Sequence, residues 1–200
     1  MDKSEALLFP LFLKLAGRSV LLVGGGPVAT AKARALADAG AEVTVVSPEL
    51  TAELAALAAA RAWQLHRRAF EATDLNQSWL AIAAAPPVVN AEVSAAAAER
   101  RIFVVAVDDP PSATAYGAGI VRRAGVTLAV STAGHAPALA GLLREGLDAL
   151  LPTDLGVWMS EAERLRTLWR AGGVPLPDRR PQLLRALNRL YVDAAEPAHG

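Results

Sequence analysis

A glycine-rich turn near the start of the chain constrains the fold more than any other feature. The stretch "VLLVGGGPVATAKARAL" covers residues 20–36. The apolar run at 19–23 predicts a short buried strand. From Pro27 to Ala39 the pattern predicts a helix, because proline suits the first turn and Gly40 suits the position just past the end. A strand, a glycine turn and a helix therefore follow each other without a gap.

Gly24, Gly26 and Ala29 fit the pattern G-x-G-x-x-G/A. The first glycine permits the tight turn, the second lets the backbone approach a pyrophosphate, and the third small residue lets the helix pack on the strand. The helix N-terminus offers free N–H groups and partial positive charge to phosphates. We therefore predict dinucleotide binding through Gly24, Gly26, Pro27 and Val28. The alternative is a merely structural bend.

Strands and helices continue to alternate after this turn, with short connections. Strands are expected at 41–47, within 63–70, at 78–85 and at 101–109, and helices at 49–62 and 88–100. This alternation is typical of βαβ units, so the fold class is α/β with a Rossmann-type parallel sheet.

The alternation of strands and helices ends near residue 112. Residues 120–134 predict two strands with a turn at 123–125, and strands without a helix between them indicate antiparallel pairing. From Pro137 onward the chain is expected to be helical, with a second helical segment at 154–171. The glycine- and proline-containing stretch 172–181 is expected to be a linker or turn before a last helix at about 182–194.

Composition excludes several function classes. The chain has 200 residues, with 20 Lys and Arg against 20 Asp and Glu, so zero net charge gives no global electrostatic reason to expect nucleic acid or an acidic membrane surface as partner. It has no cysteine, which excludes disulfides, thiolate metal sites and cysteine nucleophiles. No apolar run approaches the ~20 residues of a membrane span. The N-terminus lacks a signal-peptide pattern, and we expect a cytoplasmic protein.

The end of the second strand should meet the adenosine ribose of a dinucleotide. The strand ends in Ser47, Pro48 and Glu49, and Ser47 or Glu49 could bond a ribose hydroxyl. Because no arginine stands there to receive a 2′-phosphate, NAD is favoured over NADP. The alternative is that Ser47 and Glu49 only cap the next helix, and the two roles are compatible.

Asp108 and Asp109 close the last strand of the predicted parallel sheet. Ligands of open α/β sheets bind beyond the carboxyl ends of the strands, so an aspartate there is well placed to act as a base or to hold a cation. The alternative is that both aspartates cap the turn at Pro110-Pro111. His135 lies in a loop between a strand and a helix, where it either touches substrate or supports local structure.

Several stretches together resemble the precorrin-2 dehydrogenase/sirohydrochlorin ferrochelatase family, including the N-terminal module of siroheme synthase. These stretches are FPLFLKLAGRSVLLVGGGPVATAKARALADAGAEVTVVSP, SWLAIAAA, VNAEVSAAAAERRIF, VVAVDDPPSA and LAVSTAGHAPALAGLLREGLDALLPTDLG. They come in the family's order and spacing over about residues 8–156. The resemblance implies an NAD-binding Rossmann domain at 1–112, a dimerisation region at 113–150 and a helical C-terminal region at 151–200. It also implies a homodimer.

The resemblance also implies a reaction, in which NAD⁺ takes a hydride from precorrin-2 and a proton leaves to give sirohydrochlorin. The family's important aspartate lies seven residues before an aromatic residue, and counting back from Tyr116 selects Asp109 as the base. Some members also insert Fe²⁺ into sirohydrochlorin, and Asp109 could assist there by taking pyrrole protons. Ala84 falls in the loop that the family places near the cofactor.

The substrate carries eight carboxylates, so cationic and loop residues are candidates to dock it. The expected substrate-binding residues are Thr132, Gly134, His135, Arg122 and Arg144. Arg123 is a further candidate, and for each of these arginines the alternative is a solvated face.

The chain departs from the family at Ala85-Pro86-Pro87, where members usually carry Thr-Asp and further acids. Two other functions therefore stay open. One is a relative that binds NAD or tetrapyrrole as a sensor or carrier without turnover. The other is a chelatase without dehydrogenase activity.

Overall fold

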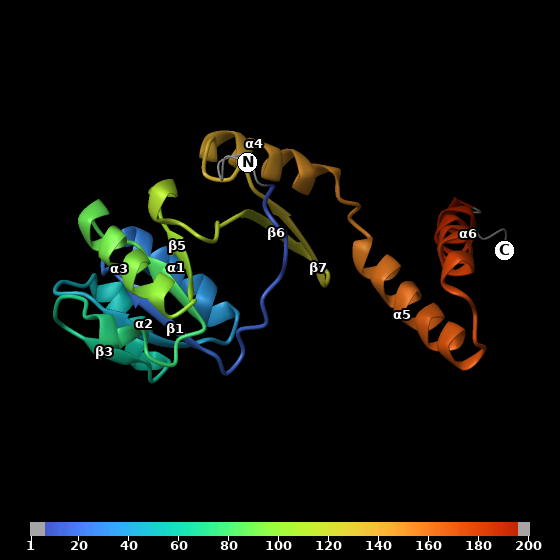
Figure 1. Cartoon of the computed structure of the whole chain (residues 1–200). Coiled ribbons are helices and arrows are strands. Elements are labelled where there is room, and N and C mark those ends of the chain that lie inside the picture. Colours follow the sequence, from blue (N-terminus) through green and yellow to red (C-terminus); the bar gives the residue numbers. More distant parts are fainter. Residues whose placement is uncertain (1–6, 196–200) are drawn as a thin grey trace. The chain divides into compact units, whose positions relative to one another are not determined.

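The computed structural model describes residues 7–195 and divides into two compact units (Figure 1). The first unit comprises the described part of Met1–Ala118 together with Ser131–Pro137. The second comprises Gly119–Val130 and the described part of Ala138–Gly200. The domain boundaries expected from the sequence stay a prediction.

A five-stranded parallel sheet forms the centre of the first unit. Its strands are β1 (Ser19–Val23), β2 (Glu42–Val46), β3 (Gln64–His66), β4 (Leu80–Ala83) and β5 (Phe103–Ala106). They lie in the order β3-β2-β1-β4-β5, and each neighbouring pair is parallel. This is the doubly wound order whose strand sequence reverses between β1 and β4, where such folds bind ligands. The predicted α/β Rossmann-type fold is confirmed.

Helices cover both faces of this sheet, which explains why the strands read as nearly continuous apolar runs. Helices α1 (Pro27–Asp38) and α2 (Ala52–Ala60) pack on one face. Helix α3 (Pro87–Glu99) and the 3₁₀ turn η2 (Ala72–Leu75) pack on the other. Alternate residues of β1 pack on opposite faces of the sheet. Val20 and Leu22 belong to the hydrophobic core on the α1 face, and Leu21 and Val23 to the core on the α3 face.

The outer edge of β5 is covered by the chain that follows it. After the 3₁₀ turn η3 (Pro110–Ser112), the backbone returns to β5. The Val104 N–H donates to Thr114 Oγ1 at 2.8 Å, and the Val104 carbonyl accepts from the Thr114 and Ala115 N–H groups, both at 2.9 Å. These bonds fix the segment that carries the two aspartates.

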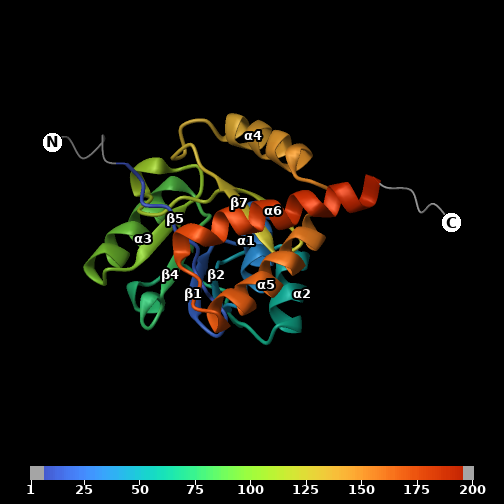
Figure 2. The same ribbon diagram turned by 90° about the vertical axis from the view of Figure 1, so that its right-hand side faces the viewer.

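The second unit begins with an antiparallel hairpin of β6 (Gly119–Arg123) and β7 (Val126–Val130), as predicted. Ala124 and Gly125 both have positive φ, 47° and 81°, as expected for a two-residue turn of this hand. Three helices follow: α4 (Pro137–Leu150), α5 (Leu155–Ala171) and α6 (Leu176–Ala195), whose chain course Figure 2 shows from a second direction.

The predicted linker at 172–181 is wrong in part, because α6 already begins at Leu176. Proline is tolerated in the first helical turn, where Pro177 lies, since the N–H groups there have no intrahelical partner. Pro181 lies inside the helix and forgoes one backbone hydrogen bond. Over the described residues, no helix is both long and apolar enough to cross a membrane.

Candidate functional site

A cavity of about 720 Å³ opens at the carboxyl ends of β1, β2 and β4, where the strand order reverses. It is lined by four short segments that follow these strands and β3, and by two residues of α3. The lining residues are Val23, Gly24, Gly25, Gly26, Val46, Ser47, Pro48, Glu49, Leu50, Thr51, Ala69, Phe70, Ala84, Ala85, Pro86, Val89 and Glu92. The glycine turn identified in the sequence therefore forms one wall of the cavity.

Gly24 and Gly25 are required because backbone passes directly against them. A Cβ on Gly24, where φ is +118°, would lie 2.2 Å from the Ala84 carbonyl oxygen. A Cβ on Gly25 would lie 1.8 Å from the Glu49 carbonyl oxygen. The Gly25 carbonyl also accepts the Thr51 N–H at 2.9 Å. The middle glycine, which the motif leaves unspecified, is thus sterically as constrained as the first.

Gly26 differs from its two neighbours, because no heavy atom lies within 4 Å of the position a Cβ would take. It is the N-cap residue of α1, and no side chain caps this helix end. The free N–H groups and the partial positive charge of α1 therefore face an open space that a side chain would fill. A pyrophosphate fits this cradle, so a dinucleotide coenzyme suits the residues that are present.

The start of α1 is joined to the start of α2 by two hydroxyl groups. The Thr30 hydroxyl donates to the Gly26 carbonyl at 3.0 Å and lies 2.8 Å from Thr51 Oγ1. Since the Thr30 proton is used on Gly26, Thr51 is the donor between the two hydroxyls. Thr51 Oγ1 also accepts from the Leu54 N–H at 3.1 Å. This network holds Gly26 in place from the buried side.

Ser47 and Glu49 line the cavity at the end of β2, as the sequence predicted. The Ser47 hydroxyl donates to the Glu49 carbonyl at 2.7 Å, so its remaining capacity toward a ligand is as an acceptor. The alternative that these two residues cap the next helix is wrong, because Thr51 is the N-cap of α2. Pro48 lies between them in the same wall.

The residues at which the chain departs from the family, Ala85-Pro86-Pro87, follow β4. Ala85 and Pro86 line the cavity, and Pro87 begins α3. Pro87 occupies the first turn of this helix, where its fixed φ and missing N–H are well tolerated. The Asn90 side chain, only 1% exposed, accepts the Ala85 N–H through Oδ1 at 3.1 Å. Asn90 therefore holds this loop against the sheet without the acids that the family carries.

Asp109 follows β5 at the same sheet edge. The Val107 N–H donates to the Ala83 carbonyl at 2.9 Å, which ties this segment to β4 directly before the cavity residue Ala84. Asp109 precedes η3, but its side chain makes no capping hydrogen bond, and its Oδ2 is buried without a hydrogen-bond partner among the described residues. The alternative of a turn cap is therefore not supported for Asp109. Asp108 beside it is exposed, with φ at +55°.

The loop at 131–137 lies next to the segment that carries Asp109. A Cβ on Gly134 would lie 3.3 Å from Pro110 Cγ and 3.4 Å from Tyr116 Cε1. Thr132 shapes this loop, because its hydroxyl accepts the Ala136 N–H at 3.2 Å. His135 is exposed on the same loop. The structure thus brings three predicted substrate residues close to the segment of the predicted base.

The arginines predicted to bind substrate belong to the second unit. Arg122 is exposed on β6, and Arg144 on α4 contacts Glu145 at 2.9 Å. Arg123 has a structural role instead, because it donates to Asp148 Oδ1 at 2.7 Å and to the Leu151 carbonyl at 3.0 Å. Substrate binding by Arg122 and Arg144 stays a prediction. The alternative for both is that they only form part of a solvated surface.

The sequence predicts some of the residues that line the cavity but not others. Of the predicted cofactor residues, Gly24, Gly26, Ser47, Pro48, Glu49 and Ala84 line the cavity, whereas Pro27 and Val28 do not. Phe70, Val89 and Glu92 were missed. Phe70 gave one weak signal, since it is a lone aromatic residue after a short predicted strand.

Metal-ligating side chains do not cluster in the part of the chain that is described. No group of three or more His, Asp or Glu residues that could hold a metal ion occurs there. Fe²⁺, expected from the resemblance as a substrate of some family members, remains a prediction.

Alanine substitutions at Gly25 and Gly26 should separate folding from coenzyme binding. Gly25→Ala should destabilise the first unit, because its Cβ cannot coexist with the Glu49 carbonyl. Gly26→Ala should leave the midpoint of urea unfolding unchanged and weaken NAD⁺ binding strongly, because its methyl group fills the cradle. Urea unfolding and calorimetric NAD⁺ titration measure the two effects. Undiminished NAD⁺ affinity of Gly26→Ala would contradict this placement of the pyrophosphate.

Comparison with known proteins agrees with this geometry. The family model described as "Putative NAD(P)-binding" matches residues 11–118, which contain the whole parallel sheet. A solved structure, SirC, precorrin-2 dehydrogenase, shares the fold with a TM-score of 0.70 and 24% sequence identity, covering 89% of this chain and 88% of that one.

Curated relatives extend the similarity beyond the sheet. Siroheme synthase 3 of Aeromonas hydrophila subsp. hydrophila is 44% identical over 172 residues, which cover 86% of this chain and 37% of the relative. The siroheme synthase of Tolumonas auensis is 48% identical over 148 residues, which cover 74% of this chain and 31% of the relative. The chain thus spans about a third of the length of these relatives. The resemblance to the siroheme synthase N-terminal module is confirmed, and the chain belongs to the NAD(P)-binding family whose model it matches.

Proposed function

We propose that this protein is an NAD-dependent dehydrogenase that oxidises precorrin-2 to sirohydrochlorin. The observation that carries this proposal is the buried, unpartnered Oδ2 of Asp109, in the segment that Val107 ties to β4 directly before the cavity residue Ala84. The similarity to siroheme synthases names the substrate class. A dinucleotide site with no carboxylate to accept a proton would be expected to bind the coenzyme without turnover. The carboxylate of Asp109 supplies the proton acceptor that the dehydrogenation needs.

Asp109 would act as the general base. The reaction removes a hydride and a proton from precorrin-2 to give sirohydrochlorin, and NAD⁺ is the hydride acceptor when bound. The Asp109 carboxylate takes the proton. Because Oδ2 makes no hydrogen bond to the described protein, it has a free acceptor position for this purpose. Positioned general bases typically contribute about 10²–10⁴-fold to a rate.

Charge in the cavity favours NAD over NADP. The charged residues that line it are Glu49 and Glu92, and neither lysine nor arginine is among the lining residues. Glu49, at the end of β2 where the adenosine ribose belongs, would repel a 2′-phosphate, whereas its carboxylate or the Ser47 hydroxyl oxygen can accept from a ribose hydroxyl. We therefore expect weaker binding of NADP⁺ than of NAD⁺.

The protein is also proposed to be a homodimer. Five leucines form an exposed stripe along α4: Leu139, Leu142, Leu143, Leu147 and Leu150, with exposed fractions from 37% to 80%. Their spacing of three, four, eight and eleven residues places them on one side of the helix. Such an apolar stripe is typical of a protein–protein interface, and a second copy of the chain is the partner that we propose.

Anaerobic incubation with precorrin-2 and NAD⁺ tests the proposed reaction directly. We expect NADH absorbance and the sirohydrochlorin spectrum to appear together in equal amounts. NAD⁺ binding without any oxidation would contradict the proposal and favour the sensor or carrier alternative. Insertion of added Fe²⁺ into sirohydrochlorin, with no oxidation of precorrin-2, would favour the chelatase alternative.

Asp109→Asn should abolish most turnover, with a loss of about 10²–10⁴-fold in kcat, because the amide cannot accept the proton. NAD⁺ affinity should stay at the wild-type value, since Asp109 does not line the coenzyme cavity. Asp108→Asn is the matched control, because this neighbour is exposed. We expect the Asp108 variant to keep its turnover, and near-wild-type turnover of the Asp109 variant would remove Asp109 from the catalytic role.

Leu142→Glu should convert the dimer into a monomer, because it places a charge in the middle of the apolar stripe. Light scattering coupled to size exclusion would show the mass falling from twice the 20.8 kDa chain to one chain. Leu176→Glu is the matched control, since this leucine is 76% exposed on α6, outside the stripe. A monomeric wild-type protein, or a dimeric Leu142→Glu variant, would contradict the proposed interface.

A further inference from the structure

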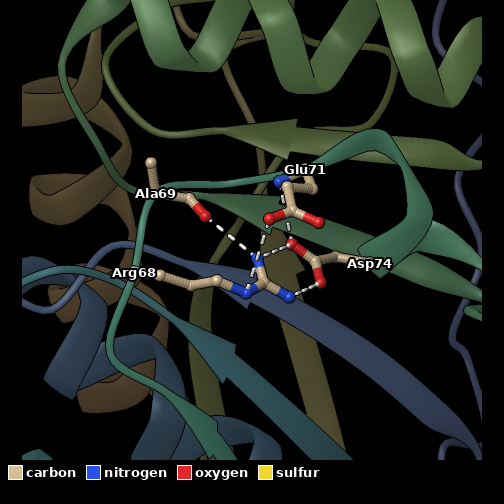
Figure 3. Close-up of polar contacts among 4 residues, drawn as sticks. All are labelled: Arg68, Ala69, Glu71 and Asp74. Atoms are coloured by element: carbon tan, nitrogen blue, oxygen red, sulfur yellow. Dashed lines mark hydrogen bonds and ion pairs between the residues drawn. The ribbon is translucent and has the colours of Figure 1, made fainter.

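An arginine and an aspartate close a short loop after β3, and Figure 3 shows their contacts. Arg68 presents its guanidinium fork to Asp74, with Nη2 2.6 Å from Oδ1 and Nη1 2.8 Å from Oδ2. Two parallel charge-assisted hydrogen bonds of this kind fix the relative orientation of the two groups as well as their distance. Glu71 adds a longer contact of 3.8 Å to Arg68 Nε.

The carboxylate of this pair is well shielded from water. The side chain of Asp74 is 6% exposed and that of Arg68 is 36% exposed. The hydrogen bond from Arg68 lowers the pKa of Asp74 below its ordinary value. A lowered folded-state pKa stabilises the fold above the unfolded value of about 3.9 and loses this effect as the pH falls through the folded-state pKa. The pair is therefore fully formed at neutral pH.

The loop closed by this pair contains two residues that line the coenzyme cavity, Ala69 and Phe70. The same ion pair holds the backbone on both sides of Phe70. Arg68 Nη1 donates to the Ala69 carbonyl at 2.9 Å, and Asp74 Oδ2 accepts the Glu71 N–H at 2.9 Å. Phe70 is partly buried against the core cluster on the α3 face of the sheet and also lines the cavity.

The sheet order indicates which half of a dinucleotide this wall meets. The pyrophosphate belongs at the glycine turn after β1, and the adenosine ribose belongs at the end of β2. Since β3 lies beyond β2 in the order β3-β2-β1-β4-β5, the residues after β3 lie on the adenosine side. The other half of the coenzyme would extend toward β4 and β5, where Asp109 follows.

We propose that Arg68 and Asp74 are positioning residues for the coenzyme, and that their ion pair holds Ala69 and Phe70 as the wall of the adenosine half of the cavity. The proposal rests on the NAD⁺ binding proposed above. Neither charged group lines the cavity itself, so the pair acts through the loop that it closes. Loss of the ion pair should therefore weaken the binding of every ligand that contains the adenosine half of the coenzyme.

Asp74→Asn and Arg68→Lys test this directly, with NAD⁺ and ADP-ribose titrated by calorimetry well below each variant's melting temperature. Both ligands contain the adenosine half, and only NAD⁺ contains nicotinamide. We expect both affinities to fall by the same factor, about tenfold, the equivalent of one charge-assisted hydrogen bond. A lower melting temperature with both affinities unchanged would overturn the proposal, and so would a loss confined to NAD⁺.

Phe70→Ala is a second variant that leaves the ion pair intact and should weaken both ligands as well. Unchanged affinity of this variant would overturn the proposal even if Asp74→Asn failed to fold. Glu53→Gln is the matched control, because it breaks an exposed ion pair with Arg34 that does not line the cavity, and we expect no change in affinity. Wild-type protein that binds NAD⁺ but does not oxidise precorrin-2 would contradict only the proposed reaction. Wild-type protein that binds no NAD⁺ would overturn both.

Discussion

The close approach of the Gly25 backbone to the loop after β2 is the constraint on which the rest of the first unit depends. No side chain fits between Gly25 and the Glu49 carbonyl, and the Thr51 N–H bonds the Gly25 carbonyl across the gap. This contact fixes the start of α1 against the start of α2. The Thr30 and Thr51 hydroxyls reinforce it from the buried side. Gly26, directly after this contact, has open space where a side chain would stand.

Local sequence determined most of the first unit, and for that reason most of it could be predicted. The five strands, their helices and the parallel pairing of the strands follow from apolar runs separated by helical segments and from the glycine turn, which are signals within a few residues of each other. The cofactor residues at 24, 26 and 47–49 follow from the same motif. The prolines between 172 and 181 predict a linker, whereas α6 begins at Leu176, accommodates Pro177 in its first turn and tolerates Pro181 in its interior.

The other features of the site depend on side-chain contacts that no sequence motif specifies, even where the two residues are only five or six positions apart. Phe70 joins the cavity wall because Arg68 and Asp74 close its loop, and the sequence alone does not show that these two charges meet. The burial of Asp109 Oδ2 depends on how the chain folds after β5. The loop at Ala85-Pro86-Pro87 is held by Asn90, whose side chain accepts the Ala85 N–H.

The segment that bonds to the outer edge of β5 has a consequence for association between molecules. An exposed strand edge can recruit a strand from another chain, which is a common route to aggregation. Here Val104 is paired on its outer side with Thr114 and Ala115 of the same chain. The opposite edge strand, β3, has only three residues. Few backbone groups are therefore available at either edge of the sheet for pairing with a strand of another molecule. We expect self-association to use surfaces outside the sheet.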